Sequence, residues 1–151
     1  EWKEYTDKSE SLKSLKGYDH HAFMIKFQNK DEYVVIRLKD PNSVDKIIPG
    51  DVSKTVKNLD VTILHSFILE QILGISKEAQ AQKLNLDYEK DIDVTLNLLN
   101  DKKYQMVFIL NPSKIGEVTS IANEGGTMPQ KSTYFYPKLY SGFIFNPFDE
   151  E

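Results

Sequence analysis

Hydrophobic and polar residues alternate along the first third of the chain. After His21, Phe23, Ile25 and Phe27 recur at every second position, which is the period of a β-strand with one buried face. A second run rich in β-branched residues covers 33–38, and the turn-forming sequence Asn-Lys-Asp lies between the two runs. The pattern therefore predicts an antiparallel hairpin over residues 21–39.

The middle of the chain changes to a helical period. Asp60 is suited to the N-cap of a helix that Gly74 would end, with its apolar stripe turned inward. Shorter helices are predicted over 9–17, 76–83 and 91–99, and another between Pro112 and Gly125. The inward residues are expected to be Val61, Leu64, Ile68 and Ile72 in the long helix, and Ile115, Val118 and Ala122 in the last one.

Three further segments have the pattern of extended chain. Residues 106–110 are continuously apolar and predict an interior strand buried on both faces. Residues 84–88 predict a brief strand, and the aromatic segment 132–148 predicts two more. The expected fold is a single α+β domain over residues 1–151, a mostly antiparallel sheet with helices packed on it, in the order ββ-α-α-β-α-ββ.

Composition narrows the possible partners. The net charge is −4 and Arg37 is the one arginine, so we expect no nucleic-acid partner. No apolar run approaches the roughly 20 residues that cross a bilayer, so we expect no membrane partner. The chain has no cysteine, which excludes thiolate chemistry and suits a cytoplasmic protein. Because it starts at Glu1 without an initiator Met, we expect it to be the C-terminal piece of a longer protein.

Few residues have the spacing of a known chemical motif. Residues 125–132 resemble a P-loop but lack the glycine before the lysine and would follow a helix rather than a strand. His20 and His21 are expected on opposite faces of a strand start, partly exposed, so no metal site is predicted. His65 falls on the apolar stripe of the long helix, where we expect it to be largely buried with one ring nitrogen hydrogen-bonded. It serves either as a structural histidine or as a proton-carrying or substrate-orienting group at the edge of a pocket.

The C-terminal third carries a resemblance to a known family. Residues 128–142 read MPQKSTYFYPKLYSG and closely resemble the C-terminal signature of a bacterial and archaeal family, the domain of unknown function 1015. Residues 59–65, 68–70 and 73–75 look like the upstream helix of the same family, and 88–91 and 108–112 resemble further features of it. The resemblance covers residues ~59–146. The family's upstream part carries a Gly-His-His-Arg motif similar to ParB-like and sulfiredoxin-like proteins, but here His21 is followed by Ala22.

Two functions remain open, and no cofactor is indicated. The first is an accessory domain that completes a small anionic-ligand or phosphate site whose chemistry lies in an upstream domain of the same polypeptide. In that case the ligand-binding residues would be Lys131, Ser132, Tyr134, Lys138 and His65, and the fragment alone is expected to have no enzymatic activity. The second is a structural or assembly domain whose aromatic C-terminal strands form the core and a homodimer interface.

Overall fold

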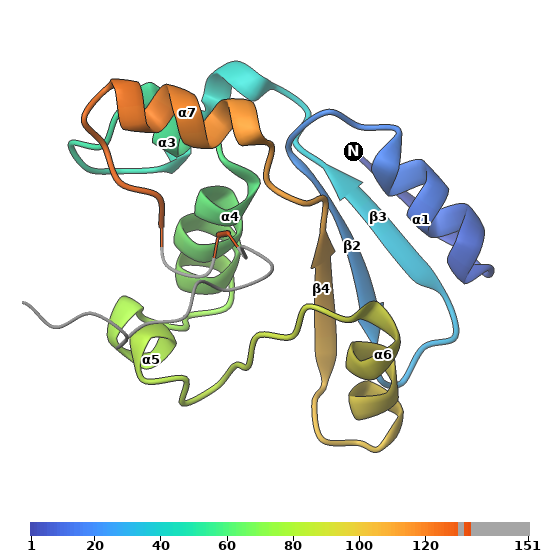
Figure 1. The fold of residues 1–151 in the computed structure, drawn as a ribbon. Helices are drawn as coiled ribbons and strands as arrows, with labels where there is room; N and C mark the ends of the chain where they lie inside the picture. The colour runs from blue at the N-terminus through green and yellow to red at the C-terminus, as the bar shows by residue number, and fades with distance from the viewer. Residues whose placement is uncertain (130–131, 134–151) are drawn as a thin grey trace, which may run out of the picture.

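The centre of the fold is a four-stranded antiparallel sheet (Figure 1). The computed structural model describes residues 1–129 together with 132 and 133. The strands, in chain order, are β1 (Trp2–Tyr5), β2 (Ala22–Phe27), β3 (Tyr33–Arg37) and β4 (Met106–Leu110). They are arranged in the order β1-β3-β2-β4, so within the described part of the chain β1 and β4 are the two edges.

Helices surround this sheet and are mostly short. The element between β1 and β2 is α1 (Lys8–Lys16). A run of helices connects β3 to β4, and one helix follows β4; in chain order they are η1 (Pro41–Ser43), α2 (Val44–Ile47), α3 (Lys54–Lys57), α4 (Asp60–Ile63), η2 (Leu64–Ile72), α5 (Lys77–Ala81), α6 (Ile92–Asn100) and α7 (Ile115–Asn123). Of these, η1 is a 3-10 helix and η2 is a π-helix.

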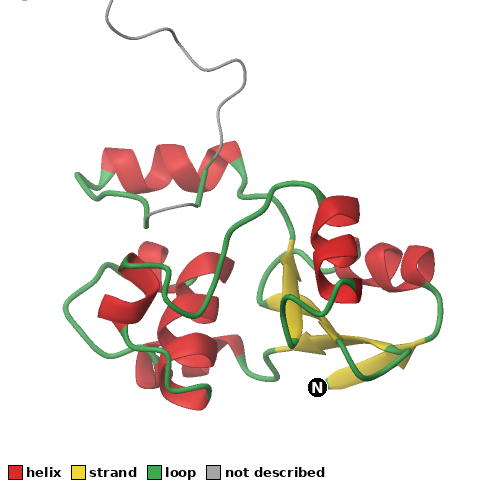
Figure 2. Cartoon of the chain, turned by 90° about the horizontal axis from the view of Figure 1, so that it is seen from below, coloured by secondary structure: helices red, strands yellow, loops and turns green. Residues whose placement is uncertain are grey.

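The sheet is covered on both faces (Figure 2). On one face, Leu15 of α1 and Leu99 of α6 pack on Met24 of β2, each at most 2% exposed. On the other face, the helices between residues 41 and 72 pack on Phe23. A smaller cluster of Val56, Leu59 and Ile121 joins α3 to α7. The molecule therefore has a helix layer, a sheet and a second helix layer, and the second layer is the thicker one.

The α+β class, the antiparallel sheet and the hairpin over 21–39 are confirmed. The helices predicted over 9–17, 76–83 and 91–99 also form. Their N-caps are Asp7, Ser76 and Asp91, and the side chain of each accepts a hydrogen bond from a backbone N–H of the first turn. The element order differs at the start, because β1 was not predicted. Its residues are mostly exposed and carry little strand pattern. Among the described residues, no helix is long and apolar enough to span a membrane.

Residues 106–110 form the predicted strand, β4, and side chains from both of its faces join the hydrophobic clusters. Among the described residues β4 pairs with β2 alone, and the strands predicted within 132–148 lie outside those residues, so its interior position stays a prediction. Val107 and Ile109 pack toward α1 and α6, whereas Phe108 and Leu110 pack toward the opposite layer. An apolar run shows that both faces of a strand are covered, and it does not show that both edges are paired.

Three smaller predictions are corrected. Residues 84–88 contain no strand: the chain bends at 84 and 85 and has no regular structure over 86–88, and Leu84 is 67% exposed. In α7 the buried residue is Ile121, whereas Ile115 is 85% exposed, because α7 packs at one side only, against α3 and Leu59.

Leu59, not Asp60, occupies the N-cap of α4. The Asp60 carboxylate accepts a hydrogen bond from the His21 backbone N–H at 2.6 Å, and burial raises the pKa of this carboxyl group. The strands predicted within 132–148 lie almost wholly outside the described residues.

Candidate functional site

The helix predicted from Asp60 continues as a π-helix after its first turn, and this changes which residues it buries. A π-helix closes its hydrogen bonds between residues five apart and is wider than an α-helix, so residues four apart and five apart both lie toward one side. The buried residues of α4 and η2 are Thr62, Ile63, Leu64, Ile68 and Leu69, so residues four and five apart share the buried side. The predicted stripe with a period of 3.6 is therefore wrong at its end, where Ile72 is 61% exposed.

Two glutamine side chains hold this π-helix in place. The side-chain amide of Gln80, a buried residue of α5, donates to the carbonyl oxygens of His65 at 3.2 Å and of Ile75 at 2.8 Å. The amide of Gln71 donates to the carbonyl oxygens of Ser66 and Ile47. These bonds give the four carbonyl oxygens a hydrogen-bond donor within the protein, which water would otherwise have to supply. They also tie η2 to α5 on one side and to α2 on the other.

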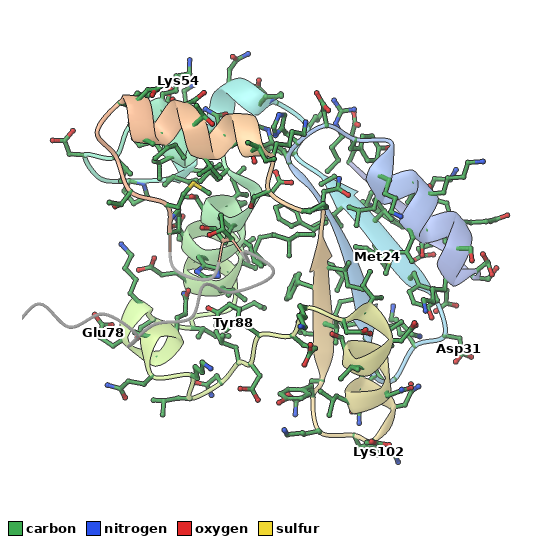
Figure 3. The ribbon with its side chains drawn as sticks, in the orientation of Figure 1. Met24, Asp31, Lys54, Glu78, Tyr88 and Lys102 are labelled. Carbon is green, nitrogen blue, oxygen red and sulfur yellow. The ribbon has the colours of Figure 1, made fainter. Side chains whose placement is uncertain are left out.

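A cavity of about 330 Å³ opens between η2, α5 and the chain around residue 88. This volume lies at the lower end of the range for small-molecule sites. Tyr88 lies below α4 and beside α5 in Figure 3. The polar lining residues are Thr62, His65, Ser66, Glu70, Lys77, Gln80, Lys83 and Tyr88, and the apolar ones are Val52, Val56, Ala81 and Pro129.

Thr62 contributes an unsatisfied hydroxyl to this cavity. The residue is 7% exposed, and its Oγ1 has no hydrogen-bond partner, the one such buried side-chain atom within the described ranges. A buried hydroxyl without a partner costs on the order of 1–3 kcal/mol. Most buried polar groups are satisfied, so this hydroxyl lacks a partner that a ligand atom would supply; because Oγ1 itself is out of reach of solvent, a ligand atom reaches it only after a small shift of the cavity wall.

His65 and Tyr88 form a polar pair at the same cavity. The Tyr88 hydroxyl lies 3.4 Å from His65 Nε2, and the ring centroids are 5.7 Å apart. Burial lowers the pKa of His65, because it disfavours the charged imidazolium, and it raises the pKa of the Tyr88 phenol. The imidazole is therefore neutral near pH 7 and becomes a cation as the pH falls.

Charged groups stand around the cavity with a surplus of positive charge. Lys77 and Lys83 both line it, as does Glu70. Lys77 Nζ lies 4.0 Å from Glu70 Oε2, a distance at the outer limit of an ion pair, and its side chain is 69% exposed. Lys83 has a left-handed backbone with φ of 54° and takes part in no ion pair within the described chain. The two ammonium groups outnumber the one carboxylate.

Of the predicted ligand-binding residues, His65 lines the cavity and Ser132 lies next to its border. His65 is half-buried, less than expected. The hydroxyl of Ser132 donates to the carbonyl of Pro129, a lining residue, and the carbonyl of Ser132 accepts from Ser113 at 2.7 Å. Lys131, Tyr134 and Lys138 lie outside the described residues, so their place relative to His65 stays a prediction.

A second concavity, of about 470 Å³, lies between the histidine pair and α7. His20 Nδ1 is 3.3 Å from Glu117 Oε1, and His21 Nε2 is 3.0 Å from the Asn58 carbonyl oxygen. The expectation of opposite faces is wrong, because both residues precede β2 and His21 has a left-handed φ of 61°. The two rings are 6.0 Å apart, and His21 is buried. Within the described part of the chain, no group of three His, Asp or Glu side chains is arranged to hold a metal ion.

Sequence reasoning found one residue of the first cavity and missed the rest of its polar wall. Thr62, Ser66 and Glu70 are spaced four apart on an otherwise apolar helix, beside His65. A polar stripe at that spacing is a detectable signal of a helix face that lines something other than the core. Lys77, at the start of α5, and Lys83 and Tyr88, outside helices and strands, carry no such signal.

Comparison of the chain with family models, with curated proteins and with solved structures finds no match. The resemblance to the domain of unknown function 1015 therefore stays a prediction, and the function must be argued from the cavity itself.

Proposed function

We propose that this domain binds a small anionic molecule in the cavity between η2 and α5, as an accessory part of a larger site. The observation that carries the proposal is the unpartnered hydroxyl of Thr62, buried in the wall of a cavity that Lys77 and Lys83 also line. A phosphate or carboxylate oxygen accepts a hydrogen bond from such a hydroxyl and pairs with an ammonium group. His65 adds a third group whose charge responds to pH.

Two features of the surroundings support this assignment. Ser66 lines the same wall, one turn from Thr62, and offers a second hydroxyl. Pro129 reaches the border of the cavity, two residues before Lys131 in the sequence. The proposal adds Lys131, Tyr134 and Lys138 to the ligand set as predicted from the sequence, with an upstream domain supplying the chemistry.

The test is a titration of the 151-residue chain with inorganic phosphate, followed by the amide chemical shifts of Ser66 and Lys83. We expect saturable shifts at these residues, and we expect Lys83→Met to weaken the affinity about fivefold, the size of one exposed charge contact. Lys13→Met, on the exposed side of α1, removes the same charge far from the cavity and serves as the matched control. Shifts that do not saturate, or an equal loss in both variants, would show that the phosphate is not bound in this cavity.

The alternative of an assembly domain rests on the aromatic residues of 134–148, which lie outside the described residues. It is distinguished by the mass in solution. A dimer at micromolar concentration that a Phe143→Ser and Phe145→Ser double variant converts to monomer would favour it. A monomer at all concentrations would leave the binding function as the remaining proposal.

A further inference from the structure

The cavity wall carries both positive and negative groups. A ligand that matches both is a narrower class of molecule than anions in general. Glu70 extends from η2 into the same cavity as Thr62 and His65. Glu70 follows His65 by five residues. In an α-helix, with 3.6 residues per turn, these two side chains would be about 140° apart around the axis. In the wider π-helix they lie closer together around the axis, and both residues line the cavity.

The Glu70 carboxylate is only weakly paired within the described chain. Its nearest cation is Lys77 Nζ at 4.0 Å, and no described residue donates a hydrogen bond to it. The Glu70 side chain is 35% exposed and that of Lys77 is 69% exposed. Pairs of this kind contribute little, because water and salt screen them and the lysine chain is free to move. The carboxylate is therefore available to a ligand cation.

A simple anion would meet an unfavourable partner here. In a cavity of about 330 Å³, an anion held by Lys83 and Thr62 stays near the Glu70 carboxylate, and like charges at such separations repel through a partly desolvated medium. A ligand that also carries an ammonium group turns this repulsion into an ion pair. The short apolar wall of Val52, Val56, Ala81 and Pro129 then accommodates a few carbon atoms between the two charges.

We infer that the ligand is a small zwitterion, a molecule with an amino group and a carboxylate or phosphate separated by a short carbon chain. The amino group binds the Glu70 carboxylate, and the anionic group binds Lys83 and the Thr62 hydroxyl. This inference rests on the proposed anion-binding function. It adds Glu70 as the residue that selects among anions.

Two pairs of probes test it on the 151-residue chain by isothermal titration. Phosphoethanolamine and ethyl phosphate share a phosphate and differ in the amino group, and alanine and propionate share a carboxylate in the same way. We expect the amino member of at least one pair to bind about tenfold more tightly than its partner, the size of one charge-assisted contact. The pair that shows the preference identifies the anionic group.

Glu70→Gln is the decisive variant. We expect it to reduce the preference to less than twofold, while the amine-free probe binds at least as well as before. Glu78→Gln on α5 removes the same charge from an exposed residue that does not line the cavity, and it should keep the full preference.

The outcomes separate the two proposals. Equal binding of both members of each pair would overturn the zwitterion and leave the anion site in place. A preference that survives Glu70→Gln would also overturn it, because the amino group would then bind elsewhere. No binding of any probe would overturn the anion site itself.

Discussion

The two faces of the sheet are closed in different ways. On the face toward α1 and α6, Leu15, Met24 and Leu99 are at most 2% exposed, and the pattern is that of a close-packed core. On the opposite side, beyond Phe23, the helices leave a cavity, an unpaired Thr62 hydroxyl and an exposed Ile72. One half of the molecule is therefore closely packed, which stabilises the fold. The other half contains polar groups that do not contribute to folding stability.

The largest expected effect tests the packed half. Leu99→Ala should destabilise the protein by about 3 kcal/mol, because it removes a fully buried side chain and leaves a void. Ile72→Ala is the matched change on the cavity side and should cost less than about 0.5 kcal/mol, because Ile72 is 61% exposed. Urea unfolding of both variants gives the two values. Similar losses would show that the two halves are packed alike.

The second effect concerns the outer side of β4. Gln28 N–H donates to the Gln105 carbonyl oxygen, so in the register of β2 with β4 the amides of Val107 and Ile109 point into the sheet. The amides of Phe108 and Leu110 point to the outer side of β4, where no described strand pairs. We expect them to exchange at least about tenfold faster than those of Val107 and Ile109, as measured by hydrogen exchange. Uniform protection along the strand would mean that its outer edge is covered too.

The third effect is the dependence of stability on pH. Burial holds the pKa of His65 below its ordinary value of 6.5 in the folded state, so the unfolded chain binds more protons in the window below 6.5. Stability from the neutral His65 is therefore full above pH 6.5 and falls as the pH is lowered through that window. Unfolding of the wild type and of His65→Gln at pH 7.5, 6.5 and 5.5 measures this. An identical pH slope in both proteins would contradict a perturbed His65.

The same comparison explains how far the sequence could lead. The hairpin and the helices capped by Asp7, Ser76 and Asp91 are local features, and a local pattern predicts them. Whether β4 lies inside the sheet depends on what pairs with it, and its apolar run reflects only the covering of its two faces.

The cavity was less predictable for a related reason. His65 could be chosen from its place on an apolar helix. The helix changes from α to π after its first turn, and side chains of Gln71 and Gln80 donate hydrogen bonds to backbone carbonyls within it. These are contacts across the turn and between helices, and residue spacing does not reveal them.

The central claim is that the Thr62 hydroxyl is kept for a ligand, and Thr62→Val tests it most directly. Valine has nearly the same shape and lacks the unpaired hydroxyl, so the variant should be more stable than the wild type by about 1 kcal/mol in urea unfolding. The same variant should bind phosphate at least about fivefold more weakly, whereas Thr62→Ser should keep the binding. A Thr62→Val protein that is less stable and binds phosphate as the wild type does would contradict the account.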